Sequence, residues 1–519
     1  MTLHFTAEPP QRVLGFGGAP SHRAVPLYGT VTTRSIEQLA QATLAPHALM
    51  QRAGLSVARL TLALAPHAQT IWLACGPGNN GGDGLEAAMH LRQWGKSPVV
   101  TWLGLPDRTP ADAKTAWQRA VDAGVTFALQ PPGQFDFGID ALLGIGASTP
   151  ASSDALPVRA IDGRMADWIN SLNAARAPVL AVDAPTGLNV NTGQASALCV
   201  QASHTLSLVT LKPGLFTADG RDASGEIWLD TLGTACSDQP HAWLAGPPLP
   251  VQRRHASHKG SYGDVAVVGG APGMTGAALL AARAALHAGA GRVFVTLLDA
   301  AAVAVDRQQP ELMFRRLEAL DLAAMTVVCG CGGATAMAEP LSKILTSAAH
   351  AVIDADGLNA IAADPQLRVK LAGRAAKGQS TILTPHPLEA ARLLATSTAQ
   401  IQQNRLRAAM QIASEMGCTV VLKGSGTVIA APGQVPVINP TGNARLATAG
   451  TGDVLAGLVG ARLATLFGKG AVGASDGAAL AFRAACEAVY LHGQAADQWP
   501  TEPALTASAL ARSLGGEKA

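Results

Sequence analysis

The feature that most constrains the fold of this chain is a sequence pattern that repeats along it: an apolar run, a glycine-rich turn and an amphipathic helix. In the first half the clearest apolar runs are residues 70–75, 98–103, 138–143 and 179–182. Strands that alternate with helices form a parallel sheet with helices on both faces. Ligands of such folds bind at the carboxyl ends of the strands, where the glycine-rich turns lie.

This repeated pattern stops at a proline-rich linker, residues 237–250, and resumes after it. The second half is expected to contain strands at residues 265–268, 293–297, 326–329, 351–353, 381–383 and 419–422, with a long alanine-rich helix ending at His287. A chain of 519 residues is too long for one ordinary core. We therefore predict an α/β protein of two domains, residues 1–245 and 246–519, the first a Rossmann-like three-layer sandwich. Ahead of the first strand, helical periodicity runs from Thr32 to near Gly54.

The composition excludes several classes of partner. Charged residues make up 14% of the chain and the net charge is +2, so no strong field attracts nucleic acid or an anionic membrane. No apolar stretch is long enough to cross a bilayer without a charge. Seven scattered cysteines, with no CxxC pair, are typical of a reducing cytoplasm. We expect a cytoplasmic protein that binds small molecules and forms a homo-oligomer, whose subunit number the sequence does not give.

The first chemical motif is the polar, glycine-rich stretch CGPGNNGGDG at residues 75–84, between a strand and a helix expected at 85–94. Glycines allow a tight turn whose N–H groups point outward, and a helix N-terminus favours a pyrophosphate. A plain turn is the alternative, but ten residues so rich in glycine and asparagine favour a binding site.

Two carboxylates follow strands of the same predicted sheet. Asp140 precedes a Gly-x-Gly turn, and Asp183 is delivered by a strand to a Pro-Thr-Gly turn. Asp183 could move a proton at a reacting carbon, with capping of a following helix as the alternative. Asn80, Asp140 and Thr186 offer only oxygen ligands, which suit potassium, sodium or magnesium rather than zinc.

The segments GPGNNGGDG, DALLGIG and VDAPTG, with LKPGL at 211–215, resemble the NAD(P)H-hydrate epimerase family over roughly residues 30 to 235. The resemblance implies that potassium is held by Asn80, Asp140 and Thr186 and that Asp183 faces the hydrated nicotinamide ring. The substrate contacts that it implies are Asn79, Asn80, Gly81, Gly82, Asp83, Gly144, Ile145, Gly146, Ala147, Ser148, Thr149 and Pro150. The family's VDIPSG is VDAPTG in this chain, and Thr186 keeps the hydroxyl.

In the second half the strongest motif is ATAGTGDVLAG at residues 447–457. Its glycines precede an apolar helix, so backbone N–H groups can form an anion hole for a transferring phosphoryl group. Asp453 could then accept the proton of an attacking hydroxyl; an N-capping role is the alternative. Residues 421–428 predict two strands joined by the turn KGSGT, and no GxxxxGK[ST] sequence is present, which excludes the P-loop class.

Two more segments complete the set. His386 stands between two prolines after a strand, a placement that favours ligand contact, and residues 354–359 gather carboxylates where a metal-bound nucleotide could bind. Together these motifs resemble the ADP/ATP-dependent NAD(P)H-hydrate dehydratase family, of ribokinase-like fold, from about 253 to 495. The resemblance implies that Ala277, His386 and Asp453 contact the hydrated cofactor. The nucleotide contacts that it implies are Lys423, Gly424, Ser425, Gly426, Thr427 and Gly452. The family's GPGLG loop is replaced by GCGGA at residues 330–334 of this chain.

The hypothesis is a two-site repair enzyme for hydrated NADH and NADPH. The first site interconverts the R and S epimers, and the second phosphorylates the hydroxyl of the S hydrate with ADP, or ATP, and magnesium, so that loss of phosphate regenerates the ring. A small-molecule kinase and a nucleotide-sensing module are the alternatives. The sequence does not decide between ADP and ATP, or between NADH and NADPH.

Overall fold

The structure is a computed structural model that describes residues 9–13, 24–145, 161, 163–249, 253, 255–468 and 477–515. It divides into two compact units, the first built from Pro26–Ala242 and the second from Trp243–Ala519. Strands β2 (Val25–Leu27) and β10 (Ala242–Leu244) each contain a point at which one unit passes into the other. In the described ranges, no helix combines the length and the apolar character that a membrane span requires.

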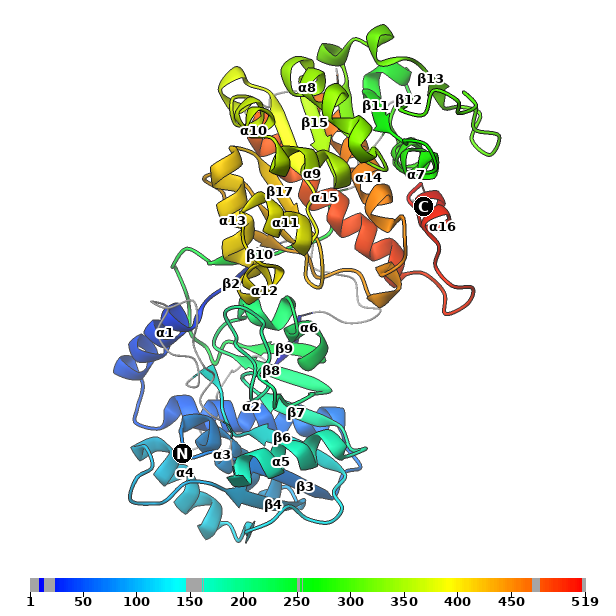
Figure 1. The fold of residues 1–519 in the computed structure, drawn as a ribbon. Helices are drawn as coiled ribbons and strands as arrows, with labels where there is room; N and C mark the ends of the chain where they lie inside the picture. Colours follow the sequence, from blue (N-terminus) through cyan, green and yellow to red (C-terminus); the bar gives the residue numbers. More distant parts are fainter. Residues whose placement is uncertain are drawn as a thin grey trace. The chain divides into compact units, whose positions relative to one another are not determined.

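The first unit contains a sheet in the order β1-β9-β8-β7-β6-β3-β4-β5, parallel except for β1 against β9 (Figure 1). Its strands are β1 Gln11–Arg12, β3 Thr70–Cys75, β4 Ser97–Trp102, β5 Thr126–Ala128, β6 Phe137–Ala141, β7 Val179–Val182, β8 His204–Leu208 and β9 Glu226–Asp230. Its helices are α1 Thr30–Thr43, α2 Ala48–Leu64, α3 Asn79–Gln93, α4 Ala111–Asp122, α5 Gly163–Ala174 and α6 Gly220–Ala223.

Alternate residues of β3 explain why this sheet is covered on both faces. Ile71 and Leu73 pack with the apolar faces of α2, α3 and α4, whereas Trp72 and Ala74 pack with Trp168 and its neighbours on α5. Side chains of a strand point alternately to opposite faces, so this strand is apolar throughout. The chain runs from β3 outward to β5 and then returns to β6 on the other side. The switch in direction places the turns after β3 and β6 next to each other, which is where open α/β sheets bind ligands.

The second unit contains a sheet in the order β13-β12-β11-β14-β15-β16-β17-β18-β19-β10, whose antiparallel pairs are β17–β18 and β18–β19. Its other strands are β11 Asp264–Gly269, β12 Arg292–Leu297, β13 Met313–Phe314, β14 Thr326–Cys329, β15 His350–Ile353, β16 Ser380–Leu383, β17 Thr419–Leu422, β18 Val428–Ala430 and β19 Val437–Ile438. Its helices are α7 Thr275–His287, α8 Ala338–Ser347, α9 Ala355–Ala363, α10 Pro365–Ala372, α11 Pro387–Leu393, α12 Thr398–Gln403, α13 Arg405–Met416, α14 Thr451–Phe467, α15 Gly477–Asp497 and α16 Ala507–Ser513.

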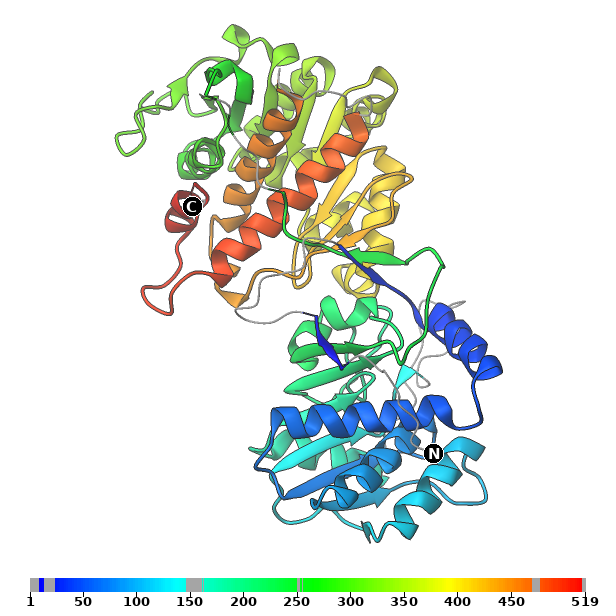
Figure 2. The same ribbon diagram turned by 180° about the vertical axis from the view of Figure 1, so that it is seen from behind.

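Helices α7, α14 and α15 cover one face of this sheet, with α14 (orange) and α15 (orange-red) in front of it in Figure 2. Their alanines and glycines permit a close approach. Gly457 of α14 faces the backbone of Ala281 on α7, and a Cβ there would lie 2.0 Å from the carbonyl oxygen of Ala281. The chain order switches between β11 and β14, so the turns after these two strands are neighbours. The turn after β14 is residues 330–334.

The predicted α/β class with two domains is confirmed, as are the strands, with ends that differ by one or two residues. Two predictions about helices were wrong. The helix expected to end near Gly54 is two helices, α1 and α2, separated at His47, whose φ is 64°, and α2 continues through Gly54 to Leu64. Residues 79–84, which were expected to form a loop turn, are the first residues of helix α3. The prediction failed because polar residues and glycines at a buried helix start obscure the helical periodicity.

Candidate active sites

Asp183 leaves β7 in a conformation that side chains rarely adopt. Its φ is 68°, in the left-handed region, where a non-glycine residue is under strain. The side chain is nearly buried, and its carboxylate accepts hydrogen bonds from Ile145 N (3.1 Å) and Leu208 N (3.3 Å). A turn follows Asp183, so the helix-capping alternative is wrong. The backbone donors hold the carboxylate at the end of the sheet, against the strain of this backbone conformation.

Lys212 is the partner of Asp183 that the sequence analysis did not single out. It is fully buried, forms an ion pair with Asp183, and donates to Leu208 O (2.8 Å) and Ser207 Oγ (3.2 Å). A buried ammonium is stable only when it is paired and hydrogen-bonded. The signal in the sequence was a lysine inside the apolar segment 211–215, where a surface residue is not expected.

Asp140 and Thr186 lie together at the buried ends of β6 and β7. Asp140 Oδ1 accepts from Thr186 Oγ1 (2.7 Å) and Oδ2 accepts from Thr186 N (2.8 Å). Burial raises the pKa of Asp140 to about 6. Within the described ranges no lysine, arginine or histidine pairs with this fully buried carboxylate. An oxygen-only cluster with an uncompensated buried charge fits a hard cation.

Asn80 lies against the turn after β6, as the switch in chain order requires. Its Oδ1 is 2.9 Å and Asp183 Oδ2 is 3.1 Å from the position that a Cβ on Gly144 would take. A side chain at residue 144 would therefore displace both groups. The Nδ2 of Asn80 is buried and has no hydrogen-bond partner in the described part of the chain, so a donor at this site is free for a ligand.

Gly81 and Gly82 have a packing role that the sequence did not indicate. A Cβ at Gly81 would lie 2.0 Å from Gly76 O, and one at Gly82 would lie 2.6 Å from the Met50 side chain. These two glycines let α3 begin directly on the turn after β3, while Asn79 is exposed at its first position. Gly146, Ala147, Ser148, Thr149 and Pro150, expected as substrate contacts, lie outside the described residues.

Two more carboxyl groups lie within the electrostatic field of Asp183. Burial, followed by the charges of Asp183 and Glu37, raises the pKa of Asp83 well above its usual range. Burial and Asp183 also raise the pKa of Glu37 to about 7, against opposing effects of Lys212 and Arg34. Asp83 was among the predicted contacts. Glu37 was missed, because its helix α1 lies far from the glycine-rich motifs in sequence.

In the second unit, Asp453 stands in the first turn of α14. The N-cap of this helix is Gly450, with φ 89°, and no side chain caps it, so the capping alternative for Asp453 is wrong. Burial, followed by the charge of Asp354, raises the pKa of Asp453 to about 6, while the thiol of Cys331 lowers it by a hydrogen bond. A half-buried carboxyl with this pKa suits proton acceptance near neutral pH.

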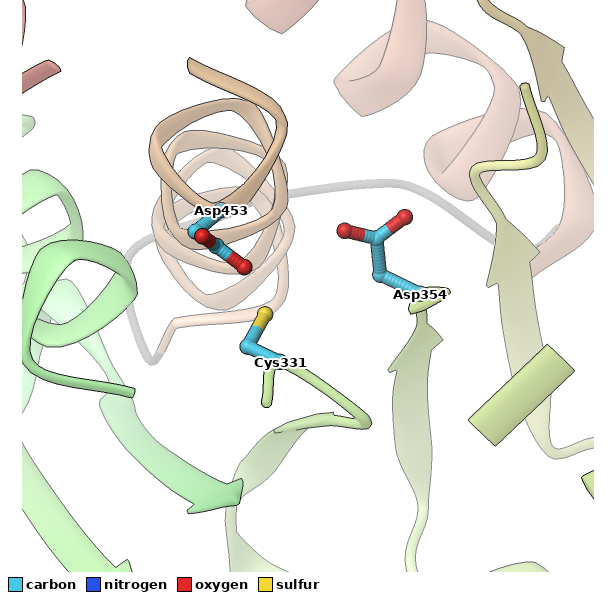
Figure 3. Close-up of side chains that lie close together, drawn as sticks. All are labelled: Cys331, Asp354 and Asp453. Carbon is cyan, nitrogen blue, oxygen red and sulfur yellow. The ribbon is translucent and has the colours of Figure 1, made fainter. Parts of the chain in front are cut away.

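Cys331, Asp354 and Asp453 point toward a common space (Figure 3). One ligand atom of each residue lies within 4.8 Å of the others. Cys331 and Asp354 follow neighbouring strands, β14 and β15, and both are buried. Burial, followed by the charge of Asp354, raises the pKa of the Cys331 thiol well above its usual range, so it is a neutral hydrogen-bond donor. The predicted carboxylate cluster at 354–359 thus joins the Asp453 site through Asp354.

Lys423 links this cluster to the predicted nucleotide turn. Its Nζ donates to Asp354 Oδ1 (2.6 Å) and lies 3.6 Å from the position of a Cβ on Gly452. The structure therefore brings two predicted nucleotide contacts, Lys423 and Gly452, side by side. Thr427 Oγ1 closes the turn on Gly424 O (3.1 Å), where Gly424 has φ 134°.

Arg405 supports this turn, and the sequence analysis missed it. Its side chain is buried, and Nη2 donates to Leu422 O (3.1 Å) and Lys423 O (3.0 Å). A Cβ on Gly424 would lie 3.0 Å from the guanidinium. Arg405 thus fixes the backbone from which Lys423 projects.

His386, which was predicted to contact the ligand, also has a structural role. Its Nδ1 accepts from Leu388 N (3.1 Å) and Glu389 N (3.3 Å) as the N-cap of α11, and Glu389 Oε2 accepts from His386 N (2.8 Å). Burial, followed by the charge of Lys423, lowers the pKa of His386. The ring therefore favours the neutral form, with Nε2 3.2 Å from Glu389 Oε1.

Ala277, the remaining predicted contact, lies against the altered loop at 330–334. A Cβ on Gly332, which has φ 60°, would lie 2.9 Å from the Cβ of Ala277. Gly332 therefore allows the loop to approach the first turn of α7. Gly332 and Ala277 are brought together in this way although they lie far apart in sequence.

Each unit thus holds buried acid–base groups beside glycine-lined strand ends, which is the arrangement of an α/β enzyme with two separate sites. Two family models match separate segments: "YjeF-related protein N-terminus" over residues 46–214 and "NAD(P)H-hydrate dehydratase" over residues 265–516. The chain belongs to the family of bifunctional NAD(P)H-hydrate repair enzymes.

Curated relatives match over most of their length. The bifunctional NAD(P)H-hydrate repair enzyme Nnr of Escherichia coli is 34% identical over 475 residues, which is 86% of this chain and 84% of that protein. The enzyme of the same name from Coxiella burnetii is 34% identical over 496 residues, with 91% and 94% covered. Among solved structures, an ADP/ATP-dependent NAD(P)H-hydrate dehydratase from Bacillus subtilis has a TM-score of 0.40 at 28% identity and covers 51% of this chain and 91% of that one.

Proposed function

We propose that this chain repairs hydrated NADH and NADPH with two activities, epimerisation of the R and S hydrates and nucleotide-dependent dehydration of the S hydrate. The observation that supports the proposal is that each unit has a carboxylate, Asp183 or Asp453, beside glycine-lined strand ends, and we assign the acid–base role to these two residues. The family of the chain combines both activities in one polypeptide. A kinase acting alone would leave the first site without a role.

The epimerisation site is assigned to residues 1–245. Asp183 is its acid–base residue, and the resemblance to the family suggests the contacts to the hydrated nicotinamide. These contacts are Asn79, Asn80, Gly81, Gly82, Asp83, Gly144, Ile145, Gly146, Ala147, Ser148, Thr149 and Pro150. Potassium is held by Asn80, Asp140 and Thr186, whose donors are all oxygens and whose buried carboxylate has no cationic partner among the described residues. The ion supplies positive charge next to the ligand.

The dehydration site is assigned to residues 246–519. Asp453 accepts the proton of the ring hydroxyl as this oxygen attacks a phosphoryl group, and the phosphate then leaves where hydroxide would leave poorly. Ala277 and His386 position the hydrated ring. The nucleotide, with magnesium, is bound by Lys423, Gly424, Ser425, Gly426, Thr427 and Gly452. We favour ADP as the phosphoryl donor, with ATP as the alternative.

We also propose that the protein works in the cytoplasm as a homo-oligomer. The balanced charge of +2 and the scattered cysteines support a reducing compartment and small-molecule ligands rather than nucleic acid. Size-exclusion chromatography with light scattering measures the oligomeric state directly.

The proposed repair activity is tested by measuring how much reduced nicotinamide is recovered from its hydrates. Purified protein is incubated with separated R and S hydrates of NADH, with and without ADP, while the absorbance of the reduced nicotinamide is followed. The S hydrate should recover only with ADP, and the R hydrate should recover faster than its uncatalysed epimerisation permits. No recovery from either hydrate with folded protein would remove the repair function, and a stable phosphorylated product would indicate a kinase.

A further inference from the structure

Helix α1 is attached to the epimerisation site on two sides of Asp183. Thr33 Oγ1 lies 2.7 Å from Thr210 Oγ1, two residues before Lys212, and Arg34 Nη2 donates to Ile145 O (3.2 Å). The N–H of the same Ile145 donates to Asp183. One helical turn therefore contacts both the segment that carries Lys212 and the turn that holds the Asp183 carboxylate.

Glu37 projects from the face of α1 that makes these contacts. It follows Thr33 by four residues and Arg34 by three, the spacings that share a helix face. Its side chain is half-buried, and in the described ranges it has no hydrogen-bond or ion-pair partner. The charged and titratable groups that act on it are Asp183, Lys212 and Arg34, and Asp83 of α3 lies in the same field. Thr33 and Arg34 dock the helix, so Glu37 is not needed for docking.

We propose that Glu37 is a second acid–base residue of the epimerisation site and works as a pair with Asp183. The inference rests on the proposed function. The two carboxyls come from different elements, α1 and the turn after β7, and differ in their partners. Asp183 is in an ion pair with Lys212, whereas the Glu37 carboxyl, which has no such partner among the described residues, is free to exchange a proton with a ligand.

The chemistry of the substrate requires two such groups. Water adds to the reduced ring at a carbon attached to the ring nitrogen, so the hydrate can lose its hydroxyl to leave a C=N iminium. Glu37 gives its proton to the hydroxyl oxygen, the C–O bond breaks with its electron pair on oxygen, and water departs. Another water adds to the opposite face of the carbon and gives a proton to the Asp183 carboxylate.

After one conversion the two carboxyls have exchanged protonation states. The chain then has an ionised Glu37 and a protonated Asp183, which is the form that converts the other epimer back. Proton exchange with solvent restores the first form. The pKa of Glu37, raised to about 7, lies near neutral pH, so this carboxyl can both give and accept a proton there.

The decisive variant is Glu37→Gln, which keeps the shape of the side chain and removes its proton exchange. Recovery from the R hydrate, with ADP present, should fall about 100-fold toward the uncatalysed rate. Recovery from the S hydrate should be unchanged, because it needs only the second unit. Glu37→Asp should restore part of the lost rate. Gln38→Ala, exposed on the same helix, is the matched control and should keep the natural rate.

The pH profile separates acid–base action from helix docking. When the R-to-S rate of the natural chain is plotted against pH, it should show a titration limb near pH 7, and the plot for Glu37→Gln should lack this limb. Thr33→Val, which removes a docking contact, should lower the rate modestly and keep the limb. An unchanged R-to-S rate in Glu37→Gln, or a limb that persists in it, overturns the inference. Failure of the natural chain to recover either hydrate overturns the proposed function instead.

Discussion

The two candidate sites use the same charge types but pair them differently. In the first unit the buried lysine, Lys212, forms an ion pair with the candidate base Asp183 itself. In the second unit Lys423 pairs with Asp354, and the candidate base Asp453 accepts a hydrogen bond from the Cys331 thiol and forms no ion pair within the described residues. The position of the lysine therefore determines which carboxylate of each site has a compensating positive charge beside it.

The largest effect is expected from Asp453→Asn. Loss of the proton acceptor should slow ADP-dependent recovery of the S hydrate by about 1,000-fold, within the range for a general base. Epimer exchange in the first unit should continue, and chromatography of the R and S hydrates measures it. Loss of both activities would contradict two independent sites.

The lysine pairing in the first unit predicts a stability effect. Lys212→Met leaves the buried Asp183 without its partner, which should reduce the free energy of unfolding by about 3 kcal/mol. A thermal scan should show the transition of the first unit at lower temperature, with recovery of the S hydrate retained at 25 °C. The double variant Lys212→Met, Asp183→Asn should regain part of the stability and no epimerisation. Equal stability of the single and double variants would contradict the pairing.

The sequence predicted the two α/β halves and the carboxylates because both follow from local patterns. A buried strand followed by glycines marks a strand end, where Asp140 and Asp183 stand, and a glycine-rich turn before an apolar run marks the helix start that carries Asp453. Lys212, Glu37 and Arg405 were missed because their roles depend on contacts between segments distant in sequence. Arg405, for example, contacts the backbone of Leu422 and Lys423 from the start of α13. No local pattern distinguishes it from a surface arginine.

Sequence reasoning also misread the start of α3. Glycine normally disfavours helices, so residues 79–84 were expected to be a turn. The helix forms because Gly81 and Gly82 remove side chains that would collide with Gly76 and Met50. Tertiary packing therefore overrides local propensity, and sequence patterns do not show this.

Removal of potassium should affect only the first site. Without the ion, the buried Asp140 carboxylate loses its compensating charge and Asn80 loses a ligand neighbour, so epimerisation should fall about tenfold in sodium or choline buffer. Recovery of the S hydrate is the internal control and should stay constant if the buffers have equal ionic strength. Asp140→Asn should make epimerisation insensitive to potassium. An effect of potassium on both activities, or on neither, would argue against the proposed ion site.

The smallest expected effect is a shift in the pH dependence of dehydration when the thiol of Cys331, which distinguishes the second site, is removed. The Cys331 hydrogen bond lowers the pKa of Asp453, which burial and Asp354 raise to about 6. Asp453 must be ionised to accept a proton, so the dehydration rate should rise with pH through about 6 in the natural chain. Cys331→Ala removes the donor, so the pKa should rise and this acidic limb should move to higher pH, with a small change in rate at pH 8. Cys418→Ala, at a buried cysteine next to β17, is the matched control. A limb that stays in place in Cys331→Ala would show that the thiol does not act on Asp453 during the reaction, and the charge of Asp354 would then be the main electrostatic influence on the base.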